Sequence, residues 1–178
     1  MDLPREFADL FEPSYVGYAD ADVVGSFEAV PQQLVHRVHL VASPAPGLVT
    51  VCRSVEGWRF LPGGRLEPGE ALGAAIEREL LEEAGCVPVG PVRPFFSHIA
   101  RSRRATPYLP HVPHPTAWWV YATVPVRIVG EPRIPDGGEQ VTEVVHLPAS
   151  RAAEWLSLSE EDQTHASVVR LAGHLGLV

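Results

Sequence analysis

Three carboxylates lie close together in one short stretch of the sequence, at Glu79, Glu82 and Glu83. Residues three and four apart share one face of an α-helix, so a helix through this stretch would bring the three side chains to one side. An apolar stripe through Ile76 and Leu80 partly overlaps that side. We therefore expect the carboxylates to border the buried face of the helix, where like charges are unfavourable unless a cation binds between them.

Carboxylate oxygens in this number are typical ligands of a hard divalent cation. Mg²⁺ and Mn²⁺ prefer oxygen ligands, whereas zinc sites are built mostly from histidine and cysteine. Magnesium also keeps several of its waters and binds the phosphates of substrates. A glycine-rich loop at Pro62–Gly64 precedes the helix, and its backbone can approach a phosphate or a metal closely. Taken alone, the triplet would equally suit an acidic helix on the protein surface.

The residues around the triplet have a much more specific spacing. From Gly64 to Cys86 the chain resembles the Nudix box, G-x5-E-x7-R-E-U-x-E-E-x-G-U, in which U is a bulky aliphatic residue. Every specified non-aliphatic position matches, and the one departure is Cys86 at the last U, where a small apolar residue should pack acceptably. The chain is thus similar to the Nudix hydrolases. This resemblance implies their fold, an α/β (α+β) sandwich of the α/β/α type with a mixed β-sheet.

The resemblance also implies an activity, the hydrolysis of a diphosphate linkage in a nucleoside diphosphate derivative by a metal-dependent Nudix pyrophosphohydrolase. The substrate would be of the nucleotide-sugar or ADP-ribose type or a (d)NTP, and the cofactor would be Mg²⁺ or Mn²⁺. A metal-bound water would attack phosphorus, because the metal neutralises the diphosphate and lowers the pKa of the water. Carried over by position, the metal ligands would be Glu79, Glu82, Glu83 and the carbonyl of Gly63.

Other positions of the box would support these ligands. Arg78 would orient Glu79 through an ion pair. Gly64 and Glu70 would support the junction between loop and helix, although Glu70 could instead contact the metal through water. The general base is not fixed within the family, and it is either a carboxylate of the box or one from a later loop. The loop candidates in this chain are Glu139 and Glu143.

Contacts to the substrate are expected outside the box. The segment from Ser97 to Pro115 is rich in Arg, His and Pro, and a long irregular connection in a compact domain is often functional, although a solvated surface loop has a similar composition. Its arginines could clamp phosphates, and aromatic side chains could stack on a base. The candidate substrate-binding residues are Arg101, Arg103, Arg104, Tyr108 and Trp58. A zinc site at His111 and His114 is disfavoured, because no cysteines or further spaced histidines accompany them.

The elements that must position these residues follow from the hydrophobic pattern. Predicted strands cover 34–41, 48–52, 89–99, 116–126 and 141–147, and predicted helices cover 3–11, 70–84, 149–156 and 159–174. Trp118 and Trp119 are adjacent on a strand, so they should point to opposite faces. We expect an N-terminal extension packed on the domain at 1–32, a Nudix hydrolase domain at 33–156 and a C-terminal helix at 157–178.

Composition limits the remaining possibilities. The length of 178 residues suits one globular domain. The net charge of −8 argues against stable nucleic-acid binding. It has no run of about 18 apolar residues that would span a membrane, and its start lacks the pattern of a secretion signal. The only cysteines, Cys52 and Cys86, are too few for a disulfide framework and are expected to be small buried residues. We therefore expect a cytoplasmic protein.

Two other functions would use the same scaffold. One is a nucleotide-sensing module that binds without cleaving, but the complete set of box residues argues against it, because a sensor has no need of all of them. The other is an isomerase of isoprenoid diphosphates, whose protonation chemistry needs an acid–base set that the sequence does not reveal. A homodimer would be ordinary for the family, and the small-molecule substrate is the one partner that the sequence indicates.

Overall fold

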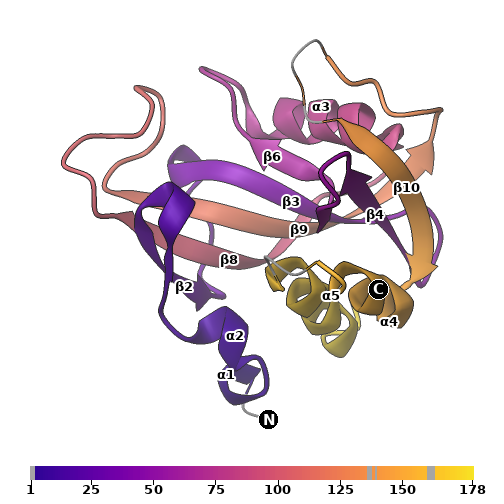
Figure 1. Cartoon of the computed structure of the whole chain (residues 1–178), viewed down its shortest axis with the longest axis horizontal. Helices are drawn as coiled ribbons and strands as arrows, with labels where there is room; N and C mark the ends of the chain where they lie inside the picture. The colour runs from indigo at the N-terminus through magenta and orange to yellow at the C-terminus, as the bar shows by residue number, and fades with distance from the viewer. Residues whose placement is uncertain (1–2, 136–137, 139, 160–162) are drawn as a thin grey trace.

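The computed structural model of the chain describes residues 3–135, 138, 140–159 and 163–178, and its helices lie on both faces of a central β-sheet (Figure 1). The strands of this main sheet are β1 (Ser14–Val16), β2 (Ala21–Ser26), β3 (Val35–Ser43), β6 (Gly63–Arg65), β7 (Cys86–Pro88), β8 (Arg93–Ser102) and β9 (Thr116–Ile128). A smaller sheet contains β4 (Leu48–Ser54), β5 (Arg59–Phe60) and β10 (Val141–Pro148). The helices are α1 (Leu3–Glu6), α2 (Ala8–Phe11), α3 (Leu72–Ala84), α4 (Ala149–Leu156) and α5 (Thr164–His174), with 3₁₀ turns η1 (Gly17–Ala19) and η2 (Gln32–Leu34).

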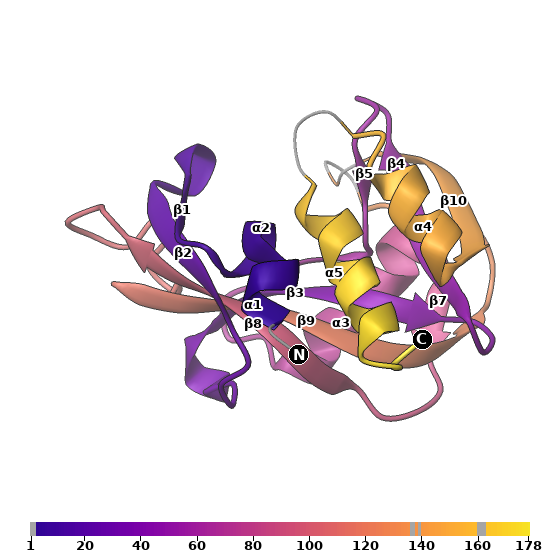
Figure 2. The same cartoon turned by 90° about the horizontal axis from the view of Figure 1, so that it is seen from below.

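The main sheet is mixed, as the resemblance implies. Its strands follow the order β1-β2-β8-β9-β3-β6, and β7 also pairs with β9. β3 and β9 run parallel, while the other neighbours run antiparallel. Figure 1 shows α3 on one side of the sheet and α4 and α5 on the other, and Figure 2 looks onto the side that carries α4 and α5. The predicted α/β/α sandwich is therefore confirmed.

Each face of the main sheet has its own hydrophobic core. Beneath α3, Ile76 and Leu80 pack with Val120 of β9. On the opposite face, Val168 and Leu171 of α5 belong to a cluster that also takes in α2 and α4. Full burial of an aliphatic side chain contributes about 1.5–3 kcal/mol, so the apolar stripe of α3 fixes this helix on the sheet. The polar edge of the same helix is thereby held against the start of β6.

The two adjacent tryptophans and the two cysteines lie where the sequence predicts. Trp118 packs in the core beneath α3, whereas Trp119 packs on the other side of β9 with Ala21 of β2. Cys52 and Cys86 are both buried, as expected. Among the helices of the described ranges, none has the length and apolar character needed to cross a membrane.

The predicted helices and strands are present with shifted ends, except that the helix predicted at 3–11 is divided at Phe7 into α1 and α2. The shifts have local causes. α3 begins two residues late, at Leu72, because Glu70 lies in a turn in which its N–H bonds to the carbonyl of Glu67. β8 begins at Arg93 but continues to Ser102, since β2 pairs with its second half. The predicted irregular connection is thus shorter than expected. Strands β1 and β2 in the N-terminal segment were not predicted, and β5, β6 and β7 are too short to show a period.

Candidate active site

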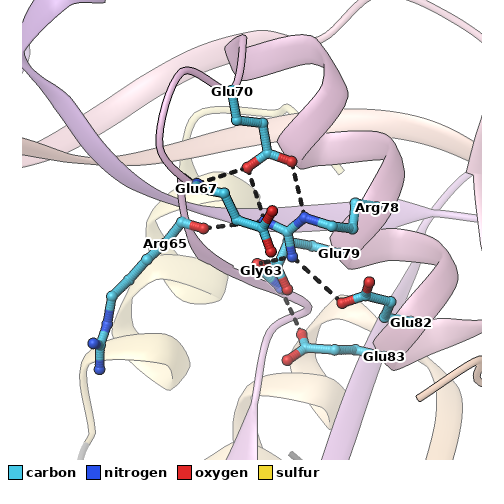
Figure 3. A network of polar contacts seen from close by, with 8 residues as sticks. All are labelled: Gly63, Arg65, Glu67, Glu70, Arg78, Glu79, Glu82 and Glu83. Atoms are coloured by element: carbon cyan, nitrogen blue, oxygen red, sulfur yellow. Dashed lines mark hydrogen bonds and ion pairs between the residues drawn. The ribbon is translucent and has the colours of Figure 1, made fainter. Parts of the chain in front are cut away.

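The box folds as a strand, a loop and a helix (Figure 3). Pairing between β3 and β6 sets Gly63 opposite His39, so the loop leaves the sheet at a fixed place. The loop then turns at Glu67–Glu70, and α3 runs to its cap at Gly85, where a left-handed φ of 60° ends the helix. Loop and helix are therefore anchored at both ends by contacts that do not involve the carboxylates.

Arg78 connects the loop to the helix with all five of its N–H donors (Figure 3). Nε and Nη2 donate to the two carboxylate oxygens of Glu70 at 2.8 and 3.0 Å, and Nη2 also donates to the carbonyl of Arg65 at 3.1 Å. Nη1 donates to Glu79 at 2.9 Å and lies 3.4 Å from Glu82. The guanidinium also holds the pKa of Glu70 below its ordinary value. A lysine could not reproduce this planar fork.

Two of the three box carboxylates are nearly buried. Glu79 is 6% exposed and Glu83 is 9% exposed, whereas the side chain of Glu82 is 24% exposed. Burial raises the pKa of Glu79 above its ordinary value, although the guanidinium of Arg78 opposes this effect. Glu83 accepts a hydrogen bond from the N–H of Gly63 at 2.8 Å. Buried carboxylates are costly unless charge or hydrogen bonds compensate them, and Arg78 and the N–H of Gly63 supply this compensation here.

Close packing leaves room only for glycine at the two positions that begin β6. A Cβ on Gly63 would lie 2.1 Å from the carbonyl oxygen of Val38, and Gly63 has a φ of 145°, which side-chain-bearing residues rarely adopt. A Cβ on Gly64 would lie 2.3 Å from Oε1 of Glu79. The backbone of the loop therefore runs directly against a neighbouring strand and against one of the carboxylates.

The donor set suits Mg²⁺ or Mn²⁺ in chemical type, because it consists of hard carboxylate oxygens. Within the described ranges, no three His, Cys, Asp or Glu side chains converge closely enough to form a complete metal site by themselves. The contacts give the reason, since Arg78 holds Glu79 and Glu82 while Gly63 holds Glu83. Waters and substrate phosphates ordinarily complete the coordination of magnesium, so an incomplete protein ligand set agrees with this type of site.

We expect Gly63→Ala to lower the free energy of unfolding by about 1–3 kcal/mol, the usual cost of a strained backbone, because the added methyl would meet backbone atoms of Val38 and His39. Gly73→Ala on α3 is the matched control. Nothing lies within 4 Å of a Cβ at Gly73, so alanine there should stabilise the protein by about 0.4–1 kcal/mol. Urea unfolding of both variants measures the difference. A Gly63→Ala protein as stable as wild type would contradict the close packing of the loop.

A pocket open to solvent adjoins the box on the side of Arg65. Its lining comes from η1, β2, β3, β6, β8, β9 and the connection between β8 and β9. Tyr108 of that connection is the one predicted substrate-binding residue in the lining, and its ring centre lies 5.6 Å from the guanidinium of Arg65. The lining also contains Trp119, one of the two tryptophans expected on opposite faces of their strand, and Arg37, which was not predicted. The one signal for Arg37 is a charged residue within a strand rich in valine and leucine.

The three predicted phosphate-clamping arginines lie outside the lining of this pocket. Arg103 is ion-paired with Asp22, and Arg104 lies 3.9 Å from Asp20. Arg101 is exposed on β8. Asp20 and Asp22 come from the N-terminal segment that joins the sheet through β2, so acidic partners from an unpredicted strand offset two of the three positive charges.

The remaining predicted residues are spread over other elements. Trp58 lies in the turn between β4 and β5, where it is 51% exposed. Glu143 is on β10, 3.9 Å from Arg53. Glu139 lies outside the described residues. His114 contacts a backbone carbonyl of the β8–β9 connection at 3.0 Å. The structure thus brings together the box residues and Tyr108, and roles for the others stay predictions.

Below pH 6.5 the protein should lose stability through His36, which is 8% exposed. Burial, helped by the positive charges of Arg37, Arg65 and His111, lowers the pKa of His36 from 6.5 to about 4. Between these two values the unfolded chain binds a proton that the folded protein does not, so stability falls as the pH falls. The expected slope from this group is about 1.4 kcal/mol per pH unit.

Urea unfolding between pH 7 and pH 4 would measure this dependence in wild type and in His36→Gln. The variant should lose that part of the slope, and the dependence caused by His39, whose pKa burial also lowers, should remain. Replacement of the exposed His111 by Gln should keep most of the slope. An unchanged slope in His36→Gln would contradict the assignment.

Comparisons with known proteins agree with this arrangement. Residues 34–171 match the family model described as the NUDIX domain. Among solved structures, the NUDIX hydrolase from Nitrosomonas europaea has a TM-score of 0.57 and 16% identity, over 80% of this chain and 90% of that chain. A mutant of the Bacillus subtilis pyrophosphohydrolase BsRppH has a TM-score of 0.56 and 14% identity, over 77% of each chain. At such identities the likeness concerns the fold. A comparison with curated protein sequences gives no match.

Proposed function

The chain belongs to the NUDIX family of pyrophosphohydrolases, and from this premise we propose that it hydrolyses the diphosphate linkage of a nucleoside diphosphate derivative with Mg²⁺ or Mn²⁺ as cofactor. One observation carries the proposal. The complete box is folded around Arg78, with Glu79 and Glu83 nearly buried against the glycine loop. Such a concentration of acidic groups is favourable for a site that binds a cation together with phosphates.

The residues of the box would either bind the metal or position the residues that bind it. Glu79, Glu82 and Glu83 would hold the metal, which when bound offsets the charge of the diphosphate and lowers the pKa of a bound water. Arg78 fixes the orientation of Glu79 through the contact at 2.9 Å. Glu70 in turn fixes Arg78 through two hydrogen bonds. Positioning of this kind supplies much of the catalysis in phosphoryl transfer.

A carboxylate must also accept the proton of the attacking water. Glu79 is suited to this role, because it is 6% exposed and its carboxylate is held in place by Arg78 at 2.9 Å. Glu139 and Glu143 stay alternatives from the later part of the chain. Glu143 is 43% exposed at its side chain and lies near Arg53, which gives it less support than Glu79.

The test is product release from a panel of nucleotide sugars, ADP-ribose and (d)NTPs, each with Mg²⁺, with Mn²⁺ and with EDTA. We expect cleavage of at least one compound that requires the metal. Reaction in ¹⁸O-labelled water should place the label in a phosphate product, because the water attacks phosphorus. Isopentenyl diphosphate belongs in the same panel, since its conversion without phosphate release would favour an isomerase.

Two results would overturn the proposal. Cleavage that continues undiminished in EDTA would remove the role of the metal. Ligand-dependent thermal stabilisation without cleavage of any compound would favour a nucleotide-sensing module.

A further inference from the structure

The pocket beside the box is connected to it through Arg65. The carbonyl of Arg65 accepts a hydrogen bond from Arg78, while its guanidinium points away from the box (Figure 3) and lines the pocket. A substrate whose diphosphate lies at the box carboxylates could therefore place a neighbouring group in the pocket. One wall is formed by Tyr18 of η1, which precedes the part of the chain matched by the NUDIX domain, residues 34–171. The pocket thus includes a feature added to that domain.

Two arginines from neighbouring strands line this pocket. Arg37 of β3 and Arg65 of β6 are directly opposite partners in the sheet, and both line the pocket. Like charges at directly opposite positions destabilise a strand pair. In the described part of the chain neither guanidinium makes an ion pair, whereas the nearby Arg103 is paired with Asp22. An anion bound between Arg37 and Arg65 would relieve their repulsion.

Buried polar atoms at the same place also lack partners. Nε of Arg37 and Nε2 of His36 are inaccessible to solvent and have no hydrogen-bond partner within the described residues. His36 is only 8% exposed, and it lines the pocket beside the two arginines. Buried polar groups are normally hydrogen-bonded, so these atoms indicate that a polar ligand completes the site.

Aromatic rings form the rest of the wall. The rings of Tyr18 and Trp119 are nearly parallel, at 14°, with centres 6.4 Å apart. The guanidinium of Arg37 lies 4.3 Å from the ring centre of Trp119 and donates a hydrogen bond to the hydroxyl of Tyr18 at 2.8 Å. Tyr108 stands next to Arg65. Since Tyr18 is 66% exposed and Tyr108 is 52% exposed, both rings can accept a planar ring by stacking.

We propose that this pocket binds the nucleoside monophosphate half of the substrate, with the phosphate between Arg37 and Arg65 and the base against the tyrosine rings. The proposal rests on the proposed function, because it takes the diphosphate to extend from the box carboxylates to these two arginines. Guanidinium groups bind phosphate oxygens in a bidentate manner, and stacking accepts any base, because every base has a π face. The other half of a nucleotide sugar also carries a phosphate but has no flat ring, so the exposed tyrosine rings favour the nucleoside half.

Binding of product-like probes without metal tests the pocket separately from the box. Ligand-observed NMR in EDTA would follow the tightest-binding common nucleoside 5′-monophosphate, its nucleoside, and ribose 5-phosphate. We expect Tyr18→Ala to weaken the monophosphate and the nucleoside about tenfold, as loss of one stacking contact does, and to spare ribose 5-phosphate. Arg37→Gln and Arg65→Gln should weaken the monophosphate and ribose 5-phosphate by a similar factor and spare the nucleoside.

The matched controls are Tyr15→Ala and Arg127→Gln, which change exposed residues outside the lining and should leave all three affinities unchanged. The proposal is overturned if the monophosphate does not bind, if Tyr18→Ala and Arg65→Gln bind it like wild type, or if both affect all probes equally. Tyr18→Ala and Arg65→Gln are sufficient to test the proposal even if Arg37→Gln fails to fold. Tyr18-dependent binding without hydrolysis of any compound would remove the proposed function and keep the pocket. Hydrolysis of a compound by the wild type, with unaltered binding in the variants, would keep the proposed function and remove the pocket.

Discussion

We expect Glu79→Gln to lower the turnover of a diphosphate substrate by about 10²–10⁴-fold, the usual effect of losing a carboxylate that takes part in proton transfer. Glu79 is 6% exposed, it is held by Arg78 at 2.9 Å, and the backbone of Gly64 lies directly against it. Glutamine has the same shape but no negative charge. The variant therefore removes the charge and the proton acceptor while it leaves the packing of the site in place.

The same variant should keep or raise the stability of the metal-free protein at neutral pH. Burial raises the pKa of Glu79 in the folded state, so the folded protein holds this proton more tightly than the unfolded chain does. Stability from this group is therefore greatest below the unfolded pKa of 4.5 and falls as the pH rises through the higher folded value. A neutral glutamine avoids that loss, so low activity in the variant cannot be attributed to unfolding.

Steady-state kinetics with saturating Mg²⁺, together with thermal melting with and without the metal, would measure both effects. Glu77→Gln is the matched control, because Glu77 is exposed on the same helix and is not among the hydrogen-bond partners of Arg78 in the described residues. Its turnover and its stabilisation by Mg²⁺ should equal those of wild type, whereas Glu79→Gln should lose most of that stabilisation. Equal turnover in the two variants would remove Glu79 from the mechanism.

The box could be predicted from the sequence because its constraints are local. Arg78, Glu79, Glu82 and Glu83 lie within six consecutive residues of one helix, so helical periodicity alone brings them to one side. Glu70 is reached by a short turn, which keeps it within range of Arg78. The apolar stripe of the same helix determines which side faces the sheet. Fold class and box geometry therefore followed from short-range spacing and a recognisable pattern.

The pocket beside the box could not be predicted as a whole, because most of its residues meet only through long-range pairing. Arg37 and Arg65 become neighbours when β6 pairs with β3, and β6 is only three residues long. Tyr18 and Asp22 enter the region because β2 joins the sheet beside β8, and β2 itself is not marked by periodicity. The positive charges that stood out in the sequence, such as Arg103, instead form surface ion pairs.

Gly64→Ala should separate activity from stability at this site. An added Cβ would lie 2.3 Å from Oε1 and 2.8 Å from Cδ of Glu79, and both atoms belong to the end of a flexible side chain. The fold can absorb the methyl by turning Glu79 away, in contrast to Gly63→Ala, where the obstacle is the backbone of β3. A misplacement of about 1 Å in a catalytic group can cost about 10²-fold in rate, and we expect a loss of turnover of that order.

The measurement compares kcat and the urea midpoint of Gly64→Ala with those of Gly63→Ala and Gly73→Ala. We expect Gly64→Ala to unfold close to the wild-type midpoint but to turn over about 10²-fold more slowly, whereas Gly63→Ala should unfold earlier. Glu79 is a proposed metal ligand that Arg78 holds in place. A displaced Glu79 should therefore weaken stabilisation by Mg²⁺ as well. Near-normal turnover in Gly64→Ala would mean that Glu79 works equally well in another position, and the close fit between this glycine and the carboxylate would then have no catalytic purpose.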